Sequence, residues 1–317
     1  MGEGFEYEKR IVAQDIPDII GQDKVKKQLK SAILMKRHTI IVGQPGIGKT
    51  TLVKGIAEIL PERDVEDDKG NKKKEKPPFV RVQGSPDLTA EDLIGDIDPV
   101  KALKYGPLSD EAFTPGKIFK ADGGILFFDE VNRCSEKLQN TLLQALEEKK
   151  VTIGSYDLDF NADFIFIGTM NPEESSTEPL SDVFLDRFDL VYMEPPETEE
   201  IELKIVKNKG RKLVDFPDKL MSKTIQFLRK LRKNENLEKH PSVRASIGIY
   251  ERAQSNAYLD SRKKVNEEDL RDAIISVLSH RISLKPSMRY TESNSQFLDK
   301  EFSKYYQEEK EQTGDGP

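Results

Sequence analysis

Short apolar segments alternate with amphipathic segments along the first part of the chain, up to about residue 196. The apolar runs at residues 39–42, 79–83, 124–128 and 164–168 have the length and composition of buried β-strands. The segment after the first run carries apolar residues at helical spacing: Leu52, Val53, Ile56, Ala57 and Leu60. This alternation predicts an α/β fold in which helices sandwich a parallel sheet.

The pattern changes after Pro195 and Pro196, where we find helical periodicity and no strand candidates. The apolar positions with helical spacing are Met221, Ile225, Leu228, Leu231, Leu270, Ile274, Val277 and Leu278. We therefore predict an αβα core over residues 1–196, an all-helical domain over 197–290, and a C-terminal helix with a flexible tail over 291–317. The last helix is expected at about residues 297–306, and the double proline is the expected linker.

Residues 61–78 interrupt the alternation with a run of charges. Acidic residues dominate its first half and lysines its second, so almost nothing in it can be buried. We predict an exposed, mobile loop and interpret it as a solvated insertion rather than a partner-binding element.

A complete G-x-x-x-x-G-K-[ST] pattern follows the first predicted strand and opens the first predicted helix, and its residues are Gly43, Gln44, Pro45, Gly46, Ile47, Gly48, Lys49 and Thr50. The glycines let backbone N–H groups turn inward on an anion at a helix N-terminus. Lys49 can reach the β- and γ-phosphates, and the Thr50 hydroxyl can ligate Mg²⁺. We count Thr51, the next residue, among the nucleotide-binding residues. The pattern predicts binding of a nucleoside triphosphate.

Two acids, Asp129 and Glu130, directly follow the apolar run at 124–128. Ligand crevices form at the carboxyl edge of a parallel sheet, so we expect both acids to face the bound triphosphate. Asp129 would hold Mg²⁺ through its water shell, and Glu130 would activate the attacking water.

A further strand, at 164–168, leads to Asn171 at the same predicted edge. Asn171 could orient the lytic water and touch the γ-phosphate. It precedes Pro172, however, and a turn-forming asparagine explains the local sequence equally well.

Composition narrows the class of protein further. The formal net charge of −7 argues against a generally basic surface for nucleic acid. A single cysteine, Cys134, excludes a disulfide framework and a cysteine-rich metal site, and the three histidines lack the spacing of metal ligands. No run approaches the roughly 18 apolar residues of a membrane span, so we expect a soluble, cytoplasmic protein.

Several motifs in order resemble those of the AAA+ ATPases of the MoxR and magnesium-chelatase I-subunit group. They occupy residues 123–133, 142–148 with 151–154, 168–174 and 185–189, and the resemblance extends over roughly residues 15–285. Residues 241–246 resemble the MoxR lid motif, whereas 168–174 resemble the chelatase subunit at least as well.

The resemblance assigns roles to matching positions. It implies that 43–50 is the Walker A loop, that Asp129 and Glu130 form Walker B, and that Asn171 is sensor 1. By the same resemblance, Arg187 is the arginine finger that completes a neighbouring subunit's site, and Arg244 is the sensor 2 residue of the lid. Arg133 corresponds to a further arginine at the subunit interface. The segment expected to pack near adenine comprises Ile19, Ile20, Gly21 and Gln22. Rigid guanidinium forks suit the charge that spreads over the γ-phosphoryl oxygens. Without the resemblance, Arg187 and Arg244 would be interpreted as surface arginines.

The resemblance also implies an ATP- and Mg²⁺-dependent ATPase that forms a homo-oligomeric ring, a hexamer, and remodels a protein partner with a von Willebrand A domain. No D-x-S-x-S metal motif of such a domain occurs in this chain, so we expect it on another chain. Residues 151–160 are predicted to form a hairpin that points into the pore in related hexamers. The hairpin carries Ser155, Tyr156, Asp157 and Asp159 instead of basic residues, which disfavours nucleic acid as the client.

Three alternatives stay open from the sequence. The first is the motor subunit of a magnesium-chelatase-type metal-insertion complex. The second is a DNA-remodelling motor, which the acidic hairpin disfavours. The third is a nucleotide-gated scaffold with negligible turnover, which the intact pair Asp129 and Glu130 disfavours.

Overall fold

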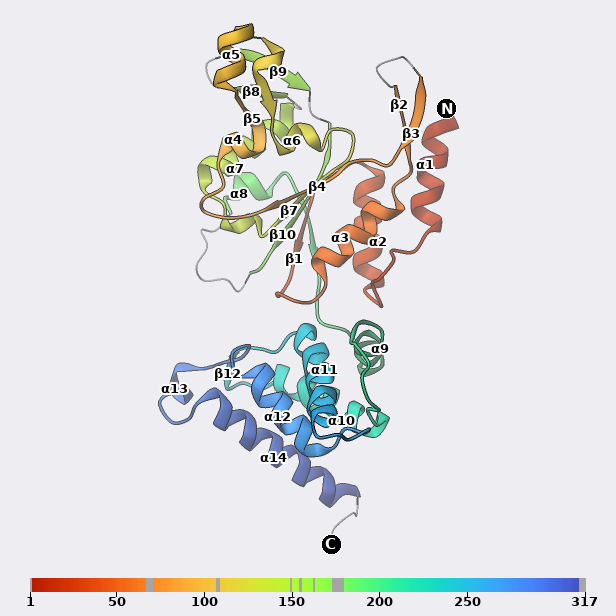
Figure 1. The fold of residues 1–317 in the computed structure, drawn as a ribbon, viewed down its shortest axis with the longest axis vertical. Helices are drawn as coiled ribbons and strands as arrows, with labels where there is room; N and C mark the ends of the chain where they lie inside the picture. The colour runs from red at the N-terminus through yellow and green to blue at the C-terminus, as the bar shows by residue number, and fades with distance from the viewer. Residues whose placement is uncertain are drawn as a thin grey trace. The chain divides into compact units, whose positions relative to one another are not determined.

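The structure is a computed structural model of the chain, and it describes residues 2–66, 71–106, 109–148, 150–153, 156–161, 163–172 and 180–313. The chain divides into two compact units, Met1–Met193 and Glu194–Pro317. Figure 1 labels the helices and strands of both units.

The first unit is built around a five-stranded sheet with the order β11-β1-β10-β7-β4. All four strand pairings in it are parallel. The elements of this unit are α1 (Gly2–Ala13), α2 (Asp23–Leu34), β1 (Thr39–Val42), α3 (Lys49–Ile59), β2 (Arg63–Glu66), β3 (Lys72–Glu75), β4 (Phe79–Gln83), α4 (Ala90–Ile94), β5 (Gly95–Ile97), α5 (Pro99–Tyr105), η1 (Asp110–Ala112), β6 (Phe113–Pro115), α6 (Lys117–Lys120), β7 (Ile125–Asp129), η2 (Val131–Arg133), α7 (Glu136–Glu148), β8 (Lys150–Ile153), β9 (Tyr156–Asn161), β10 (Ile165–Met170), α8 (Asp182–Leu185) and β11 (Asp189–Tyr192).

Helices cover both faces of this sheet (Figure 1) because successive strand residues point to opposite sides. Ile41 and Phe127 face a core that they share with apolar residues of α2 and α3. Leu126 and Phe128, their alternating neighbours, face a second core that contains Leu142 and other residues of α7. The expected parallel sheet sandwiched by helices is therefore confirmed.

The sheet contains one strand that the hydrophobic pattern did not indicate. β11 pairs with β1 in parallel, with Thr39 opposite Asp189 and Val42 opposite Tyr192. Only Val191 of its four residues is buried, because β11 lies at the edge of the sheet. A polar edge strand of this length has no strong period-two signal, which explains why sequence reasoning missed it.

The charged insertion contains regular structure that contradicts the prediction of a loop. Its described residues form an antiparallel hairpin of β2 and β3. Opposite charges face each other across it, in the pairs Arg63 with Glu75, Asp64 with Lys74 and Glu66 with Lys72. Such cross-strand pairs stabilise a hairpin without burial, and all four residues of β3 are indeed exposed.

The second unit is helical apart from one small sheet. Its elements are α9 (Glu199–Lys209), α10 (Asp218–Arg232), β12 (Leu237–Lys239), α11 (Val243–Leu259), α12 (Glu267–Leu278), β13 (Ser283–Leu284), α13 (Pro286–Arg289) and α14 (Asn294–Thr313). The antiparallel pair β12 and β13 corrects the expectation that no strands occur here. These strands have three and two residues, too few for a recognisable alternation.

One apolar core unites the helices of the second unit. The predicted apolar positions of α10 and α12, such as Leu228 and Ile274, are fully buried in it. α14 closes this core with Phe297, Leu298 and Phe302, and it extends beyond the expected residues 297–306.

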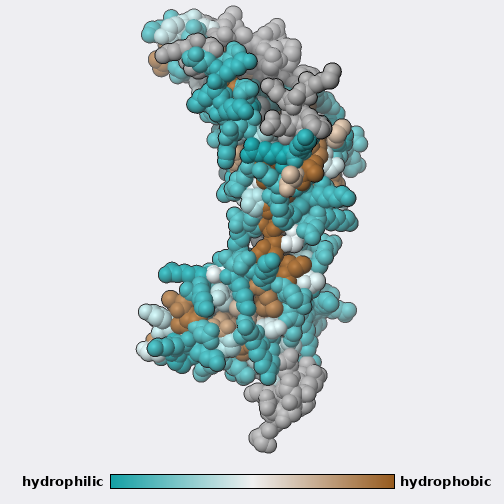
Figure 2. All heavy atoms as spheres, turned by 90° about the vertical axis from the view of Figure 1, so that its right-hand side faces the viewer, coloured by the Kyte–Doolittle hydropathy of each residue, from teal (hydrophilic) through white to brown (hydrophobic). Residues whose placement is uncertain are grey.

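Most of the face drawn in Figure 2 is hydrophilic, in keeping with the 34% of charged residues. Among the described residues, the structure contains no helix of sufficient length and apolarity to span a bilayer.

Candidate nucleotide-binding site

The phosphate-loop sequence lies between the carboxyl end of β1 and the start of α3. Gly46 and Gly48 have φ angles of 79° and 106°, which residues with side chains rarely adopt. A Cβ atom on Gly43 would lie 2.5 Å from the carbonyl oxygen of Met193, so this position accepts only glycine. Gly48 is the N-cap of α3, and no side chain caps the helix. The backbone N–H groups of its first turn can therefore donate hydrogen bonds to a bound anion.

Lys49 folds back over this loop. Its Nζ donates to the carbonyl oxygen of Gly43 and, at 2.9 Å, to that of Gln44. Pro45 and Ile47 lie in the same loop, and Thr50 and Thr51 follow in the first turn of α3. The ammonium group is thus held next to the backbone that the sequence predicts to surround phosphate.

Asp129, the last residue of β7, is almost completely buried and has donors on both carboxylate oxygens. Its Oδ2 accepts hydrogen bonds from Thr50 Oγ1 at 3.4 Å and from Arg81 Nη2 at 2.6 Å. Its Oδ1 accepts one from Thr169 Oγ1 at 2.6 Å. The two residues predicted to hold Mg²⁺, Thr50 and Asp129, are therefore neighbours in the fold.

Thr169 joins the two acids at the end of β7. Its side chain is fully buried on β10, the strand beside β7. Its Oγ1 accepts a hydrogen bond from the backbone N–H of Glu130 at 2.9 Å while it donates to Asp129. Sequence reasoning missed Thr169, although a hydroxyl within an otherwise apolar strand next to the acids was the available signal.

Glu130 adopts a left-handed backbone conformation, with φ 59° and ψ 53°. Such a conformation is costly for a residue with a side chain, and residues of this kind are enriched at functional sites. The adjacent backbone tolerates no side chain, because a Cβ on Gly84 would lie 2.0 Å from the carbonyl oxygen of Glu130. The carboxylate accepts a hydrogen bond from Gln83 Nε2 at 2.9 Å and pairs with Arg133 Nη1 at 3.2 Å.

Two residues of β4 contact the acid pair, and sequence reasoning identified neither of them. Arg81 contacts Asp129 and Gln83 contacts Glu130. β4 pairs with β7 such that Gln83 lies opposite Asp129 in the register. This register places alternate residues of β4 beside the acids, and it cannot be inferred from the local sequence.

Asn171 directly follows β10. Its backbone carbonyl accepts a hydrogen bond from Asn132 Nδ2 at 3.4 Å. Because β10 and β7 are adjacent and parallel, Asn171 lies at the same sheet edge as the acids. Glu173 and Glu174 of the same motif lie outside the described residues.

The predicted arginines have different surroundings. Arg187 follows α8 and pairs with Glu147 of α7. Arg133, close to the site, pairs with Glu130 as described above. Arg244 belongs to the second unit, where it lies exposed in the first turn of α11.

The segment predicted to lie near adenine approaches the phosphate loop. Ile19 Cδ1 would lie 3.7 Å from a Cβ on Gly48, and Met193 Cε would lie 3.6 Å from it. Ile20 and Gly21 follow, both half-buried, and Gly21 has a φ of 70°. An apolar wall therefore borders the loop.

The predicted hairpin at 151–160 is present in its described parts. β8 and β9 pair in antiparallel fashion, with Val151 opposite Phe160. Its tip, including Gly154 and Ser155, lies outside the described residues.

A phosphate loop at the start of a helix, beside two acids on a neighbouring strand end, defines a P-loop nucleoside triphosphatase. Family models match this chain twice: the AAA domain (dynein-related subfamily) matches residues 38–188, and the AAA lid domain matches residues 229–301. The chain belongs to the AAA+ ATPases, with a AAA domain followed by a AAA lid.

Individual relatives support this assignment. Chaperone MoxR1 of Mycobacterium tuberculosis is 26% identical, over 84% of this chain and 73% of that protein. A magnesium-chelatase subunit ChlI homolog of Methanocaldococcus jannaschii is 28% identical, over 84% of this chain and 85% of that protein. Among solved structures, a cryo-EM-based complex of magnesium-chelatase subunits BchI and BchD contains a chain with a TM-score of 0.50 and 20% identity, over 86% of this chain and 97% of that one. The last similarity shows the fold alone.

Proposed function

We propose that this ATPase binds ATP at residues 43–51 and hydrolyses it with Mg²⁺, using Asp129 and Glu130. The proximity of Thr50 Oγ1 and Asp129 Oδ2, 3.4 Å apart beside the phosphate loop, carries this proposal. The ammonium of Lys49, which contacts two loop carbonyls, would exchange them for the β- and γ-phosphate oxygens. Ile20 and Gly21 would border the adenine.

The oxygen atoms of the Thr50 hydroxyl and the Asp129 carboxylate are suitable ligands for Mg²⁺, which prefers hard oxygen ligands and retains several waters. Arg81 already places a positive group 2.6 Å from Asp129 Oδ2, so this oxygen faces a position suited to a cation. Thr50 and Asp129 would hold the Mg²⁺, which would supply positive charge to offset the negative charge of the triphosphate. Asp129 would orient the metal's water shell, because Thr169 fixes its other oxygen.

Glu130 is our proposed general base, and Asn171 is the residue that would orient the attacking water. The contacts of Gln83 and Arg133 with the Glu130 carboxylate hold this group at the site. The proton of the water would pass to a Glu130 carboxylate oxygen as the water attacks the γ-phosphorus, while the bond from the γ-phosphorus to the β–γ bridging oxygen breaks and ADP leaves.

We further propose a homo-oligomeric ring, a hexamer, in which Arg187 completes the site of a neighbouring subunit and Arg244 acts as the sensor 2 residue. Within its own chain Arg187 pairs with Glu147, and the Arg187 side chain is 30% exposed to solvent. It could therefore exchange this partner for a phosphate across an interface. Such an arrangement couples ATP binding to subunit association.

The partner we propose is a protein, and specifically one with a von Willebrand A domain. The names of the relatives support a protein partner, since MoxR1 is described as a chaperone and BchI is found in complex with BchD. The net charge of −7 disfavours a nucleic-acid client.

A second candidate is the motor subunit of a magnesium-chelatase-type complex. The observation that favours it is the 28% identity to a ChlI homolog over most of both chains. Addition of candidate chelatase partner subunits would separate the two proposals, because only the chelatase motor should support metal insertion into a porphyrin.

ATP affinity and steady-state turnover of the wild type, Lys49→Ala and Glu130→Gln test the catalytic assignment. Lys49→Ala should lose triphosphate binding, because it removes the cation of the phosphate loop. Glu130→Gln should bind ATP normally and turn it over very slowly. Near-normal turnover by Glu130→Gln would contradict the assignment of the base.

A further inference from the structure

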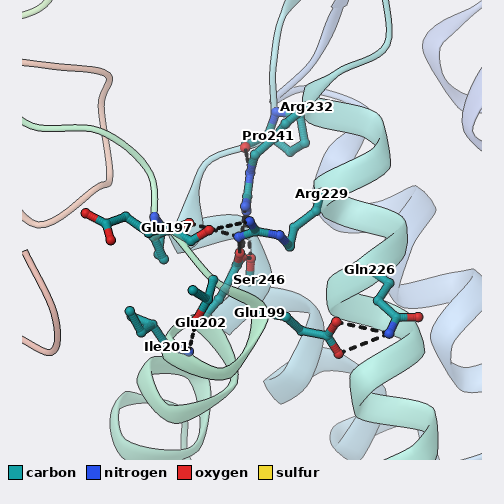
Figure 3. A network of polar contacts seen from close by, with 11 residues as sticks. Glu197, Glu199, Ile201, Glu202, Gln226, Arg229, Arg232, Pro241 and Ser246 are labelled. Atoms are coloured by element: carbon teal, nitrogen blue, oxygen red, sulfur yellow. Dashed lines mark hydrogen bonds and ion pairs between the residues drawn. The ribbon is translucent and has the colours of Figure 1, made fainter.

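The second unit contains a buried polar network around a single carboxylate (Figure 3). Glu202 of α9 is 0% exposed. Arg232 of α10 donates to both of its oxygens at 2.7 Å, and Ser246 of α11 donates to Oε1 at 2.6 Å. A buried carboxylate is costly unless it is paired and hydrogen-bonded, and this one is both. We call Glu202, Arg229, Arg232 and Ser246 the Glu202 network.

One side of the network holds the chain where it enters the second unit. Arg229 Nη1 donates to the carbonyl oxygen of Pro196 and Nη2 to that of Glu197, both at 2.8 Å. The same guanidinium lies 3.6 Å from Glu202 Oε2. Figure 3 shows Arg229 reaching from α10 to this entering segment. The planar guanidinium fork can hold two carbonyls at once, which a lysine could not do with the same geometry.

The other side of the network holds the start of the helix that carries Arg244. Arg232 Nε donates to the carbonyl oxygen of Pro241 at 2.8 Å, just before α11 begins. The N-cap residue Ser242 makes no capping hydrogen bond with its side chain. Contacts at Pro241 and Ser246 therefore bracket the first turn of α11, and Arg244 lies between them.

The entering segment is also close in sequence to the phosphate loop. Met193 N donates to the carbonyl oxygen of Val42, and the Met193 carbonyl oxygen limits the space at Gly43. Only Glu194 and Pro195 separate Met193 from Pro196. Two successive prolines, Pro195 and Pro196, restrict the backbone of this connection.

From this continuity we propose that Arg229, Arg232 and Glu202 are positioning residues for Arg244. They join residues 196–197, where the chain enters the second unit, to the first turn of α11, so these two segments move as one body. The proposal builds on the function proposed above for Arg244.

Arg229→Ala is the variant that tests this proposal, because Arg229 is partly exposed and its loss leaves the pair of Arg232 and Glu202 intact. Its control is Arg271→Ala, which removes an exposed ion pair with Asp299 elsewhere in the same unit. Thermal unfolding of both variants establishes that the second unit still folds.

The first readout is cleavage by a glutamate-specific protease, followed by mass spectrometry. Glu197 is followed by Thr198, whereas Glu194 is followed by proline and resists cleavage. Arg229→Ala releases the Glu197 carbonyl, so we expect cleavage after Glu197 at least about threefold faster than in the wild type and in Arg271→Ala. Unchanged cleavage overturns the proposal, whether or not the protein hydrolyses ATP.

The second readout is a double-mutant cycle in ATP turnover. Arg229→Ala alone should lower kcat at least about threefold, and Arg229→Ala in an Arg244→Ala background should lower it no further. A merely structural role of Arg229 would instead give additive losses, which would overturn the proposal. Absence of hydrolysis by the wild-type protein would contradict the proposed function and leave the cleavage test of the network valid.

Discussion

Thr169 Oγ1 donates a hydrogen bond to Asp129 Oδ1 at 2.6 Å from a fully buried position on the neighbouring strand. The same oxygen accepts the N–H of Glu130. One hydroxyl therefore orients the carboxylate proposed to face Mg²⁺ and also stabilises the left-handed backbone of the proposed base. The Thr169 hydroxyl is already hydrogen-bonded to both acids. Any contribution of Thr169 to activity would therefore come through the position of these acids.

We expect Thr169→Val to impair ATP turnover with little change in fold. The nearly isosteric substitution leaves the Asp129 oxygen and the Glu130 N–H without their partner, which costs about 1–3 kcal/mol for a buried group. Turnover should fall by roughly tenfold if a comparable amount is lost from the transition state. Thr169→Ser keeps the hydroxyl and should retain most of the activity. Equal turnover of the valine and serine variants, measured at saturating ATP, would contradict this role.

Arg81→Ala should lower the Mg²⁺ concentration required for tight ATP binding. Arg81 and the metal compete for Asp129 Oδ2, and the arginine side chain is 46% exposed. The expected shift is about two- to fivefold, the equivalent of an exposed ion pair. Binding of a fluorescent ATP analogue across a Mg²⁺ titration measures it. Arg37→Ala, which removes the exposed pair with Asp189, is the matched control. A higher Mg²⁺ requirement in Arg81→Ala would show that Arg81 supports the bound complex instead.

Mixing two inactive variants should restore ATP turnover if the active sites are shared between subunits. Glu130→Gln and Arg187→Ala proteins should each be nearly inactive, because a transferred arginine can contribute on the order of 10³-fold. Subunit exchange forms some interfaces at which an Arg187→Ala subunit supplies Glu130 and its neighbour supplies Arg187. Turnover should then return at a fraction of the wild-type rate. Demonstrated exchange without any activity, at every mixing ratio, would count against Arg187 acting across the interface.

Cys134 should react slowly with thiol reagents in the native protein. It is 2% exposed, and burial raises the pKa of its thiol to about 11. At pH 8 only roughly a thousandth of it is then the reactive thiolate. We expect modification at least about 100-fold slower than in denaturant. Ellman's reagent provides the measurement, and comparable rates in the two conditions would show that Cys134 is accessible.

The local pattern was sufficient where a residue's role depends on its immediate neighbours. The glycines of the phosphate loop, Lys49 and Thr50 are neighbours in the sequence, so their spacing alone indicates them as the proposed phosphate-binding residues. The strand ending in Asp129 was equally visible, because a fully buried strand is a continuous apolar run. The carboxyl-edge rule for parallel sheets led to the expectation that the acids face the phosphate loop, and Thr50 Oγ1 lies 3.4 Å from Asp129 Oδ2 in the structure.

The sequence by itself therefore determined the α/β core, the helical second unit, the phosphate loop and the strand-end acids, all of which follow from local periodicity and spacing. Tertiary structure decided which residues surround those acids. Arg81, Gln83 and Thr169 reach them only because β4, β7 and β10 pair in one register, and a shift of one residue would point each side chain to the opposite face. Tertiary structure likewise brings Glu202 of α9 to Arg229 and Arg232, which both lie on α10. Such contacts depend on packing between segments distant in sequence, and no local pattern encodes that packing.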